Sequence, residues 1–274
     1  MELKNKIAIV TGSGTGIGRT IAVEFAKEKA MVVCCGRRME KLQETISIIE
    51  KEGGKGIAVK TDVTNPAEVK NLVSKTLKEF GGIDILFNNA GSFRTIGGLW
   101  EVDPEEWWQD VTINLRGVML CCYAVLPYMM KQNSGIIINM NGGGATSYLT
   151  GGSAYACSKA AVMRLTENLE KELQHEGSNV FVFGMGPGLV KTEMTELQAK
   201  SEQGRKWIPS TGECFEKGNV RLPEECARTT IELIRVACSE LNGRNFGAGQ
   251  DFSKILERLP EIQKNDLYLL RFKS

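Results

Sequence analysis

The chain has 274 residues, 42% of them hydrophobic and 24% charged, which is enough apolar material for one well-packed α/β domain. Its formal net charge is only +1 and its charges are interspersed, so neither nucleic acid nor an anionic membrane surface is expected as a partner. The first apolar run begins within a few residues of Met1, and no apolar run reaches the ~20 residues of a membrane span. These features predict a cytoplasmic protein without a signal peptide or membrane anchor.

Short apolar runs alternate with amphipathic stretches along most of the chain and predict strands at 6–11, 31–35, 57–61, 83–87, 135–140, 179–184 and 244–248. Strands that alternate with helices indicate a doubly wound, parallel seven-stranded sheet with helices on both faces, the Rossmann fold, in a single domain over 1–274. Three of the helices are expected to begin at a proline, after Asn65, Asp103 and Leu222. Ligands of such a sheet bind at the carboxyl ends of its strands.

Two regions depart from this alternation. Residues 189–222 form a long connection rich in Lys, Glu, Gly and Ser, and long connections in compact domains are usually lids or binding loops. We expect a substrate lid there. Residues 250–274 form a C-terminal tail, and its apolar cluster at 267–272 predicts docking on this or another subunit rather than a free end. We expect the protein to assemble as a homodimer or homotetramer.

The chain has eight cysteines but no CxxC motif, and His175 is its single histidine. A zinc site of ordinary Cys/His composition is therefore not expected, and we predict no metal. Most of the cysteines lie in apolar stretches, where they are typical of small buried side chains in a reducing compartment. A redox role for them is the less favoured alternative.

A glycine-rich turn follows the first expected strand, in the segment Thr-Gly-Ser-Gly-Thr-Gly-Ile-Gly at 11–18. Glycine lets the backbone approach a diphosphate and adopt positive φ, and the N-terminus of the following helix supplies N–H donors. A strand before the turn and a helix after it favour a dinucleotide site over a plain turn. The residues expected to form this site are Gly12, Ser13, Gly14, Thr15, Gly16, Ile17 and Gly18.

The end of the second expected strand bears on the choice of nicotinamide cofactor. An acidic residue at this point binds a ribose 2′-hydroxyl, whereas an arginine accommodates a 2′-phosphate. Gly36 stands where the acid would be, followed by Arg37 and Arg38. Gly36 leaves room and Arg37 offers a planar fork of donors, which favours NADP(H). The alternative is that both arginines are surface residues opening the next helix, in which case NAD(H) serves.

A phenol and an ammonium group are paired further along the chain. Tyr155 and Lys159 are four residues apart, one helical turn on the same face. A nearby cation favours the phenolate and so lowers the pKa of a tyrosine from its usual value of about 10. Such a tyrosine exchanges protons near neutral pH, which suits hydride transfer to or from a carbonyl beside a dinucleotide site.

With these motifs in order, the chain resembles the short-chain dehydrogenase/reductase superfamily in its single-domain form, from about residue 5 to about residue 249. The resemblance rests on the glycine turn, Asp62-Val63, Asn88-Asn89-Ala90-Gly91, Asn114, Tyr155-x-x-x-Lys159, and Pro187-Gly188 followed by Thr192. It implies that Asp62 and Val63 contact the adenine and that the segment containing Asn89, Ala90 and Gly91 stabilises the sheet beside the cofactor. It further implies that the nicotinamide ring is gripped by Pro187, Gly188, Val190 and Thr192.

The same resemblance implies the catalytic roles. Tyr155 would be the general acid in reduction and the base in oxidation. Lys159 would bind the nicotinamide ribose and lower the pKa of Tyr155, and Asn114 would hold a water in a proton relay to Lys159. A purely structural role for the asparagines, satisfying buried backbone groups, is compatible with these roles.

One position departs from the family pattern. The family carries a serine thirteen residues before the tyrosine, where it hydrogen-bonds the substrate oxygen, and this chain has Gly142. Asn141 should point to the opposite face, so we expect Ser147 or the backbone amides of 142–144 to stand in, with Thr146 and Ser153 also within reach along the chain. The alternative is that the site simply lacks the group.

The expected function is therefore hydride transfer between NADP(H) and a hydroxyl/carbonyl pair of a small molecule. Two alternatives remain: a catalytically weak or silent protein that binds the cofactor, and a reductase of an activated C=C bond. The substrate pocket is expected among 92–99, 146–152 and 189–222, which includes Trp207. The sequence does not indicate the substrate itself.

Overall fold

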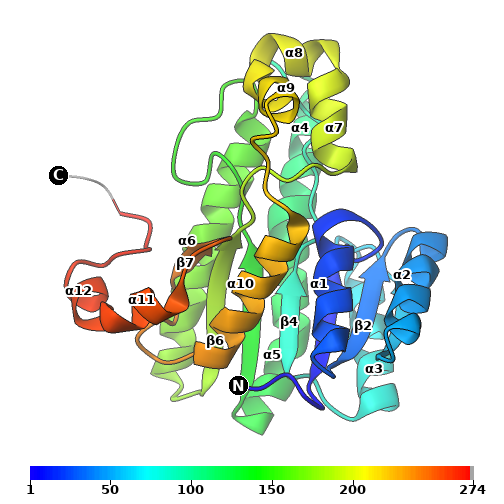
Figure 1. The fold of residues 1–274 in the computed structure, drawn as a ribbon, viewed down its shortest axis with the longest axis vertical. Helices are drawn as coiled ribbons and strands as arrows, with labels where there is room; N and C mark the ends of the chain where they lie inside the picture. Colours follow the sequence, from blue (N-terminus) through cyan, green and yellow to red (C-terminus); the bar gives the residue numbers. More distant parts are fainter. Residues whose placement is uncertain (272–274) are drawn as a thin grey trace.

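The computed structural model describes residues 1–271, and its centre is one parallel sheet of seven strands (Figure 1). The strand order is β3-β2-β1-β4-β5-β6-β7. The bounds are Ile7–Thr11 for β1, Met31–Gly36 for β2, Lys55–Lys60 for β3, Ile85–Asn88 for β4, Gly135–Met140 for β5, Val180–Gly186 for β6 and Asn245–Gly247 for β7. The seven predicted strands are confirmed, with ends that differ by a few residues. The order reverses between β1 and β4, where such folds open a crevice for ligands.

Helices cover both faces of the sheet, which confirms the predicted Rossmann-type fold (Figure 1). One face carries α1 (Gly16–Lys27), α2 (Met39–Lys51) and α10 (Pro223–Val236). The other carries α3 (Pro66–Phe80), α5 (Gly117–Gln132) and α6 (Ser153–His175). Each face of the sheet packs its own hydrophobic core against these helices. Successive side chains of a strand point to opposite faces, so Val10 of β1 packs in the first core and Ile9 in the second.

The three helix starts predicted at prolines are confirmed. The Asn65 side chain accepts hydrogen bonds from the N–H groups of Ala67 and Glu68 at the start of α3. Asp103 caps α4 (Pro104–Val111) in the same way. Leu222 precedes α10 without a side-chain cap, as its apolar side chain requires. Two of the helices thus begin where a polar cap and a proline coincide.

One helical stretch is more apolar than the sequence analysis allowed. α4, a π-helical turn (Thr112–Arg116) and α5 join into one helix over Pro104–Gln132, with a mean hydropathy of 1.3 over 18 residues. By length and composition alone this stretch could cross a membrane, but a core helix of a globular protein meets the same criteria. The expectation concerned uninterrupted apolar runs, and charged residues interrupt this helix. In the fold, α5 buries its inner face in the second core.

The connection at 189–222 is largely helical, which the sequence analysis did not predict. It contains α7 (Glu193–Lys200), α8 (Glu202–Trp207) and α9 (Pro209–Glu216), which lie beyond the carboxyl ends of the strands, at the top of Figure 1. A reciprocal capping arrangement between Thr192 and Thr195 starts α7. In this capping box Thr195 stands at the third helical position, where Glu or Gln is usual, so the sequence analysis did not identify the start of α7.

The C-terminal tail docks on its own chain. After α11 (Phe252–Glu257) and α12 (Leu259–Lys264), the side chains of Leu267 and Tyr268 pack against the first core. The backbone N–H of Leu270 then donates to the Glu167 carboxylate. The predicted apolar cluster at 267–272 is thus used within the subunit as far as residue 271; Phe272 lies outside the described residues.

Candidate active site

A cavity of about 960 Å³ opens at the carboxyl ends of the strands and gathers most of the predicted site residues. Its wall includes Gly12, Gly14, Thr15, Gly16, Ile17, Arg37, Arg38, Asp62, Val63, Asn89, Ala90, Gly91, Tyr155, Lys159, Pro187, Gly188, Val190 and Thr192. The three predicted residues missing from the wall are Ser13, Gly18 and Asn114. All three are buried and lie behind it.

The glycine turn fits a group that needs close backbone approach. Gly12 and Gly16 have φ angles of 64° and 54°, a region that favours glycine. A Cβ at Gly18 would lie 2.5 Å from the Gly12 carbonyl oxygen, so α1 contacts the turn too tightly for any side chain. On the strand side, the Asn89 amide donates to the Thr11 carbonyl oxygen at 2.9 Å. The turn and the first residues of α1 therefore present backbone N–H groups to the cavity.

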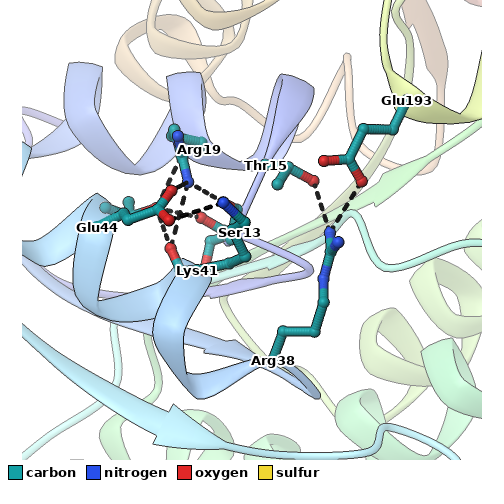
Figure 2. A network of polar contacts seen from close by, with 9 residues as sticks. Ser13, Thr15, Arg19, Arg38, Lys41, Glu44 and Glu193 are labelled. Atoms are coloured by element: carbon teal, nitrogen blue, oxygen red, sulfur yellow. Dashed lines mark hydrogen bonds and ion pairs between the residues drawn. The ribbon is translucent and has the colours of Figure 1, made fainter.

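A buttress behind the turn was not foreseen. Figure 2 shows Arg19 of α1 reaching across to α2, where it bonds the Glu44 carboxylate at 2.8 Å and the Thr45 hydroxyl at 3.1 Å. The same guanidinium donates to the Gly14 carbonyl oxygen. The Thr45 hydroxyl donates to the Ser13 carbonyl oxygen at 2.9 Å. The turn is thus held from behind by side chains. No local sequence pattern predicts these contacts, because Arg19 lies on α1 and its partners Glu44 and Thr45 lie on α2.

The far end of the cavity is open and positively charged. A Cβ at Gly36 would meet only Leu42 at 3.6 Å and Gly12 at 3.9 Å, so Gly36 leaves space at the end of β2. Arg37 and Arg38 line the cavity beside it. The Asp62 carboxylate is engaged locally, accepting from the Thr64 N–H at 2.9 Å and from its hydroxyl at 2.8 Å. This Asx-type turn orders the segment that leads away from β3.

Tyr155 and Lys159 lie on the first turns of α6 and both line the cavity. The Lys159 side chain is 2% exposed, and its Nζ donates to the Met140 carbonyl oxygen at 2.9 Å. The ammonium lies 5.6 Å from the centroid of the Tyr155 ring. Burial of the charged form lowers the pKa of Lys159 to about 8.

The expected lowering of the Tyr155 pKa is wrong for this form of the protein. Burial raises the pKa of Tyr155 to about 12, because the phenolate would be poorly solvated. The four-residue spacing does place Lys159 beside the ring, but its ammonium is committed to Met140. Desolvation therefore outweighs the attraction of the cation, and the phenol is protonated at neutral pH.

Asn114 is fully buried in the π-helical turn, a feature often found at functional sites. Its side-chain oxygen accepts from the Ser92 N–H at 2.7 Å, and its amide donates to the Ser92 carbonyl oxygen at 2.8 Å and to the Ser158 hydroxyl at 3.0 Å. A Cβ at Gly91 would lie 3.1 Å from Asn114 Oδ1 and 3.8 Å from Lys159 Nζ. Asn114 thus links the backbone at Ser92 to Ser158 of α6, close to the Lys159 ammonium.

The space beside Gly142 is occupied by the tyrosine itself. A Cβ at Gly142 would lie 2.8 Å from both Cε1 and Cζ of Tyr155, and nearer still to its hydroxyl oxygen. The Tyr155 ring also stacks on Phe93, with centroids 4.5 Å apart and planes 12° from parallel. A side chain at position 142 and this placement of Tyr155 exclude each other. The sequence analysis did not identify Phe93 individually.

The structure does not bring the proposed side-chain substitutes for the serine into the site. Thr146 and Ser147 are exposed and do not line the cavity. The Ser153 hydroxyl accepts a hydrogen bond from the Trp107 indole at 2.9 Å. Asn141 lines the cavity, which the sequence analysis did not expect; its amide donates to Asn245 Oδ1 of β7 at 2.7 Å, and its own Oδ1 is buried without a partner. The backbone amides of 142–144 are the remaining candidates.

The part of the cavity beyond Tyr155 has a mixed wall. Of the expected pocket segments, 92–99 and the α7 region contribute, whereas 146–152 does not. The α7 face toward the cavity carries Met194, Leu197 and Gln198, spaced as one side of a helix. Gln198 is 5% exposed, and its Nε2 is buried without a hydrogen-bond partner. Trp207 packs against Trp100 outside this wall.

Comparison with known proteins agrees with this geometry. The family profile for short chain dehydrogenases matches residues 6–203. A short chain dehydrogenase of Pseudocercospora fijiensis is 35% identical over 98% of this chain and 90% of its own length. An uncharacterized oxidoreductase of Staphylococcus aureus is 37% identical over 73% of this chain and 85% of its own.

Solved structures show the same fold. A variant of actinorhodin polyketide ketoreductase, crystallised with NADPH, superposes with a TM-score of 0.81 at 28% identity, covering 88% of this chain and 95% of the other. Levodione reductase gives a TM-score of 0.80 at 27% identity, covering 89% and 96%. With a glycine turn, a tyrosine–lysine pair and these relatives in agreement, the chain belongs to the short-chain dehydrogenase/reductase family and is an oxidoreductase that uses a nicotinamide cofactor.

Proposed function

We propose that this protein transfers a hydride between NADP(H) and a hydroxyl/carbonyl pair of a small molecule. The observation that carries the proposal is that Tyr155 and Lys159 line the same cavity as the glycine turn and Arg38. One cavity therefore offers a site for phosphates at one end and a proton donor at the other. The second structural neighbour is a reductase and the first a ketoreductase by name, which supports the reductive direction.

The residues of this chain would divide the work as follows. A bound nicotinamide supplies or accepts the hydride. Tyr155, protonated at neutral pH, donates its proton to the substrate oxygen in reduction. Lys159 is charged below a pKa of about 8, and its Nζ, which donates to the Met140 carbonyl oxygen in the free protein, would donate to a ribose hydroxyl of the bound cofactor. Its charge stabilises the phenolate that Tyr155 leaves behind.

The preference for NADP(H) rests on the space at Gly36 and the two arginines beside it. A 2′-phosphate needs room and cationic donors. Gly36 supplies the room, in place of an acidic side chain that would repel the phosphate, and the two arginines supply the donors. The ketoreductase neighbour was crystallised with NADPH, which supports the same choice. Asp62 and Val63 would contact the adenine, and the segment from Pro187 to Thr192 the nicotinamide.

The substrate end favours a ketone or alcohol with an apolar body and a second oxygen. Phe93, Ile96, Met194 and Leu197 supply apolar wall, and the unpaired amide of Gln198 supplies a donor. A site with a few oriented polar groups in an apolar wall is typical of small-molecule pockets. The helices over 193–216 act as the lid that excludes water during the reaction.

The direct test is oxidation of NADPH by the purified protein with a panel of cyclic and aromatic ketones and diketones. We expect turnover with at least one class, and a Tyr155→Phe variant that binds NADPH but does not turn over. Binding of NADPH without turnover of any carbonyl would contradict the proposal.

A second candidate is favoured by a specific observation. Gly142 brings no hydroxyl, and Tyr155 fills the space beside Gly142 and stacks on Phe93. A protein that binds NADP(H) with weak or no carbonyl activity, or one that reduces an activated C=C bond, needs no serine at this point. An α,β-unsaturated ketone assayed with product analysis separates these cases, because the C=C and C=O products differ.

For assembly, we propose a homodimer or homotetramer in the cytoplasm. The outer face of α5 exposes Met119, Tyr123 and Met130, which supports contact with a second copy. All eight cysteines are free thiols, which supports a reducing compartment. Light scattering of the purified protein tests the assembly.

A further inference from the structure

An ion pair crosses the mouth of the cavity at its charged end. Arg38, which follows β2, donates from Nη2 to the Glu193 carboxylate at 3.0 Å and contacts the Thr15 hydroxyl at 3.4 Å. Glu193 is the first residue of α7, 155 residues away in sequence (Figure 2). Both side chains are about half exposed, so solvent and ligands can reach the pair.

The sequence analysis assigned a 2′-phosphate to Arg37, and the guanidinium of Arg38 in the same cavity is a second donor for it. Arg38 follows Gly36 by two residues and lines the same cavity, and its guanidinium contacts the Thr15 hydroxyl at the edge of the glycine turn. A carboxylate and a phosphate compete for the same fork of N–H donors. In the free protein the Glu193 carboxylate therefore occupies donors that an adenosine 2′-phosphate would use.

The same contact connects this end of the cavity to the substrate end. Thr192, next to Glu193, lies against the glycine turn: a Cβ at Gly16 would be 3.2 Å from its Cγ2. Later residues of α7, Met194 and Gln198 among them, form part of the wall beyond Tyr155. A ligand that binds Arg38 in place of Glu193 would therefore free the first residue of α7, the helix that forms part of the substrate pocket.

We propose that Glu193 is a cofactor-selectivity residue whose carboxylate fills the 2′-phosphate subsite of the free protein. NADP(H) must displace this carboxylate from Arg38, and displacement releases the N-terminus of α7. NAD(H), which has no 2′-phosphate, leaves the ion pair and the start of α7 in place. This inference rests on the proposed binding of NADP(H) at Arg37 and Arg38.

Because exposed ion pairs contribute little, the expected effect is modest. Glu193→Gln should tighten the binding of NADPH about two- to fivefold, which corresponds to about 0.4–1 kcal/mol. It should leave NADH unchanged. The amide keeps the size of the side chain and removes the competing charge.

The experiment measures dissociation constants by calorimetry for NADPH and NADH, and for the fragments 2′,5′-ADP and 5′-ADP. Glu196→Gln is the matched control, since this residue lies on the same helix and pairs with Lys200 at 3.0 Å rather than with the cavity. We expect Glu193→Gln to tighten NADPH and 2′,5′-ADP by the same factor, and Glu196→Gln to change neither. In an Arg38→Gln background, the effect of Glu193→Gln should vanish.

Three outcomes would overturn the inference: unchanged NADPH binding in Glu193→Gln, an equal gain for NADH, or an equal gain from Glu196→Gln. Hydrogen exchange gives an independent readout, with faster exchange at the start of α7 expected for the NADPH complex than for the NADH complex. The proposed function fails separately, if the unmodified protein binds neither cofactor or prefers NADH. A protein that prefers NADPH but is indifferent to Glu193→Gln contradicts the inference alone.

Discussion

Replacement of Gly142 by alanine tests whether Tyr155 fills the space of the absent side chain. The added Cβ would lie 2.8 Å from two ring carbons of Tyr155 and closer to its hydroxyl oxygen, so the ring must move. The ring is also held by Phe93, which stacks on it with centroids 4.5 Å apart. Overpacking of this kind costs about 1–3 kcal/mol of unfolding free energy.

The neighbouring glycine is a matched control. A Cβ at Gly143 would meet nothing within 4 Å, so Gly143→Ala should change stability by less than about 0.5 kcal/mol. Removing the ring should also remove the clash. In a Tyr155→Ala background, Gly142→Ala should therefore be near neutral, which gives a coupling energy of about 1–3 kcal/mol in a double-mutant cycle.

Urea unfolding of the four variants of the cycle and of Gly143→Ala measures these quantities. The reasoning is refuted if Gly142→Ala costs no more than Gly143→Ala, or if its cost persists without the tyrosine ring. The same geometry bears on Gly142→Ser. Restoring the family's hydroxyl should not raise activity unless Tyr155 also shifts toward the substrate.

Four further predictions follow from the site. Tyr155→Phe should abolish turnover while NADPH binding, measured by fluorescence, changes less than about twofold, because the hydroxyl acts in the transition state; a near-normal rate would refute its role. NADPH should bind at least tenfold more tightly than NADH, about 1.4 kcal/mol, and Arg37→Ala should erase most of that gap; tighter binding of NADH by the unmodified protein would contradict it. Lys159→Met should be more stable than the unmodified protein at pH 7 by up to about 3 kcal/mol, because the folded-state pKa of Lys159 lies near 8 and the unfolded-state value near 10.5. Between these two pKa values the unfolded chain binds more protons, so the unmodified protein gains stability as pH rises and the difference in thermal unfolding should shrink; a constant difference from pH 7 to 10.5 would show that the lysine is not desolvated. Finally, residues 193–222 should exchange amide hydrogens faster in the free protein than in the complex with both cofactor and substrate, because the substrate closes the lid whose first residue NADPH alone releases; uniform protection in the free protein would contradict their role as a lid.

Local patterns in the sequence were sufficient for the architecture and for the location of the site. The strands follow from apolar runs, and the starts of α3 and α4 from a polar cap beside a proline, because both signals act within a few residues of the chain. The glycine turn follows from backbone geometry that few other residues can adopt. The spacing of Tyr155 and Lys159 placed both side chains on one face of a helix and in one cavity.

Only the tertiary structure decided how these residues act on one another. The direction of the Tyr155 pKa depends on a competition between burial and a neighbouring charge, and spacing along a helix determines neither the depth of the ring nor the partner of the lysine. The occupation of the Gly142 space by Tyr155 and the pairing of Arg38 with Glu193 join segments far apart in the chain. Such contacts are set by the packing of whole helices and strands, so no local pattern encodes them.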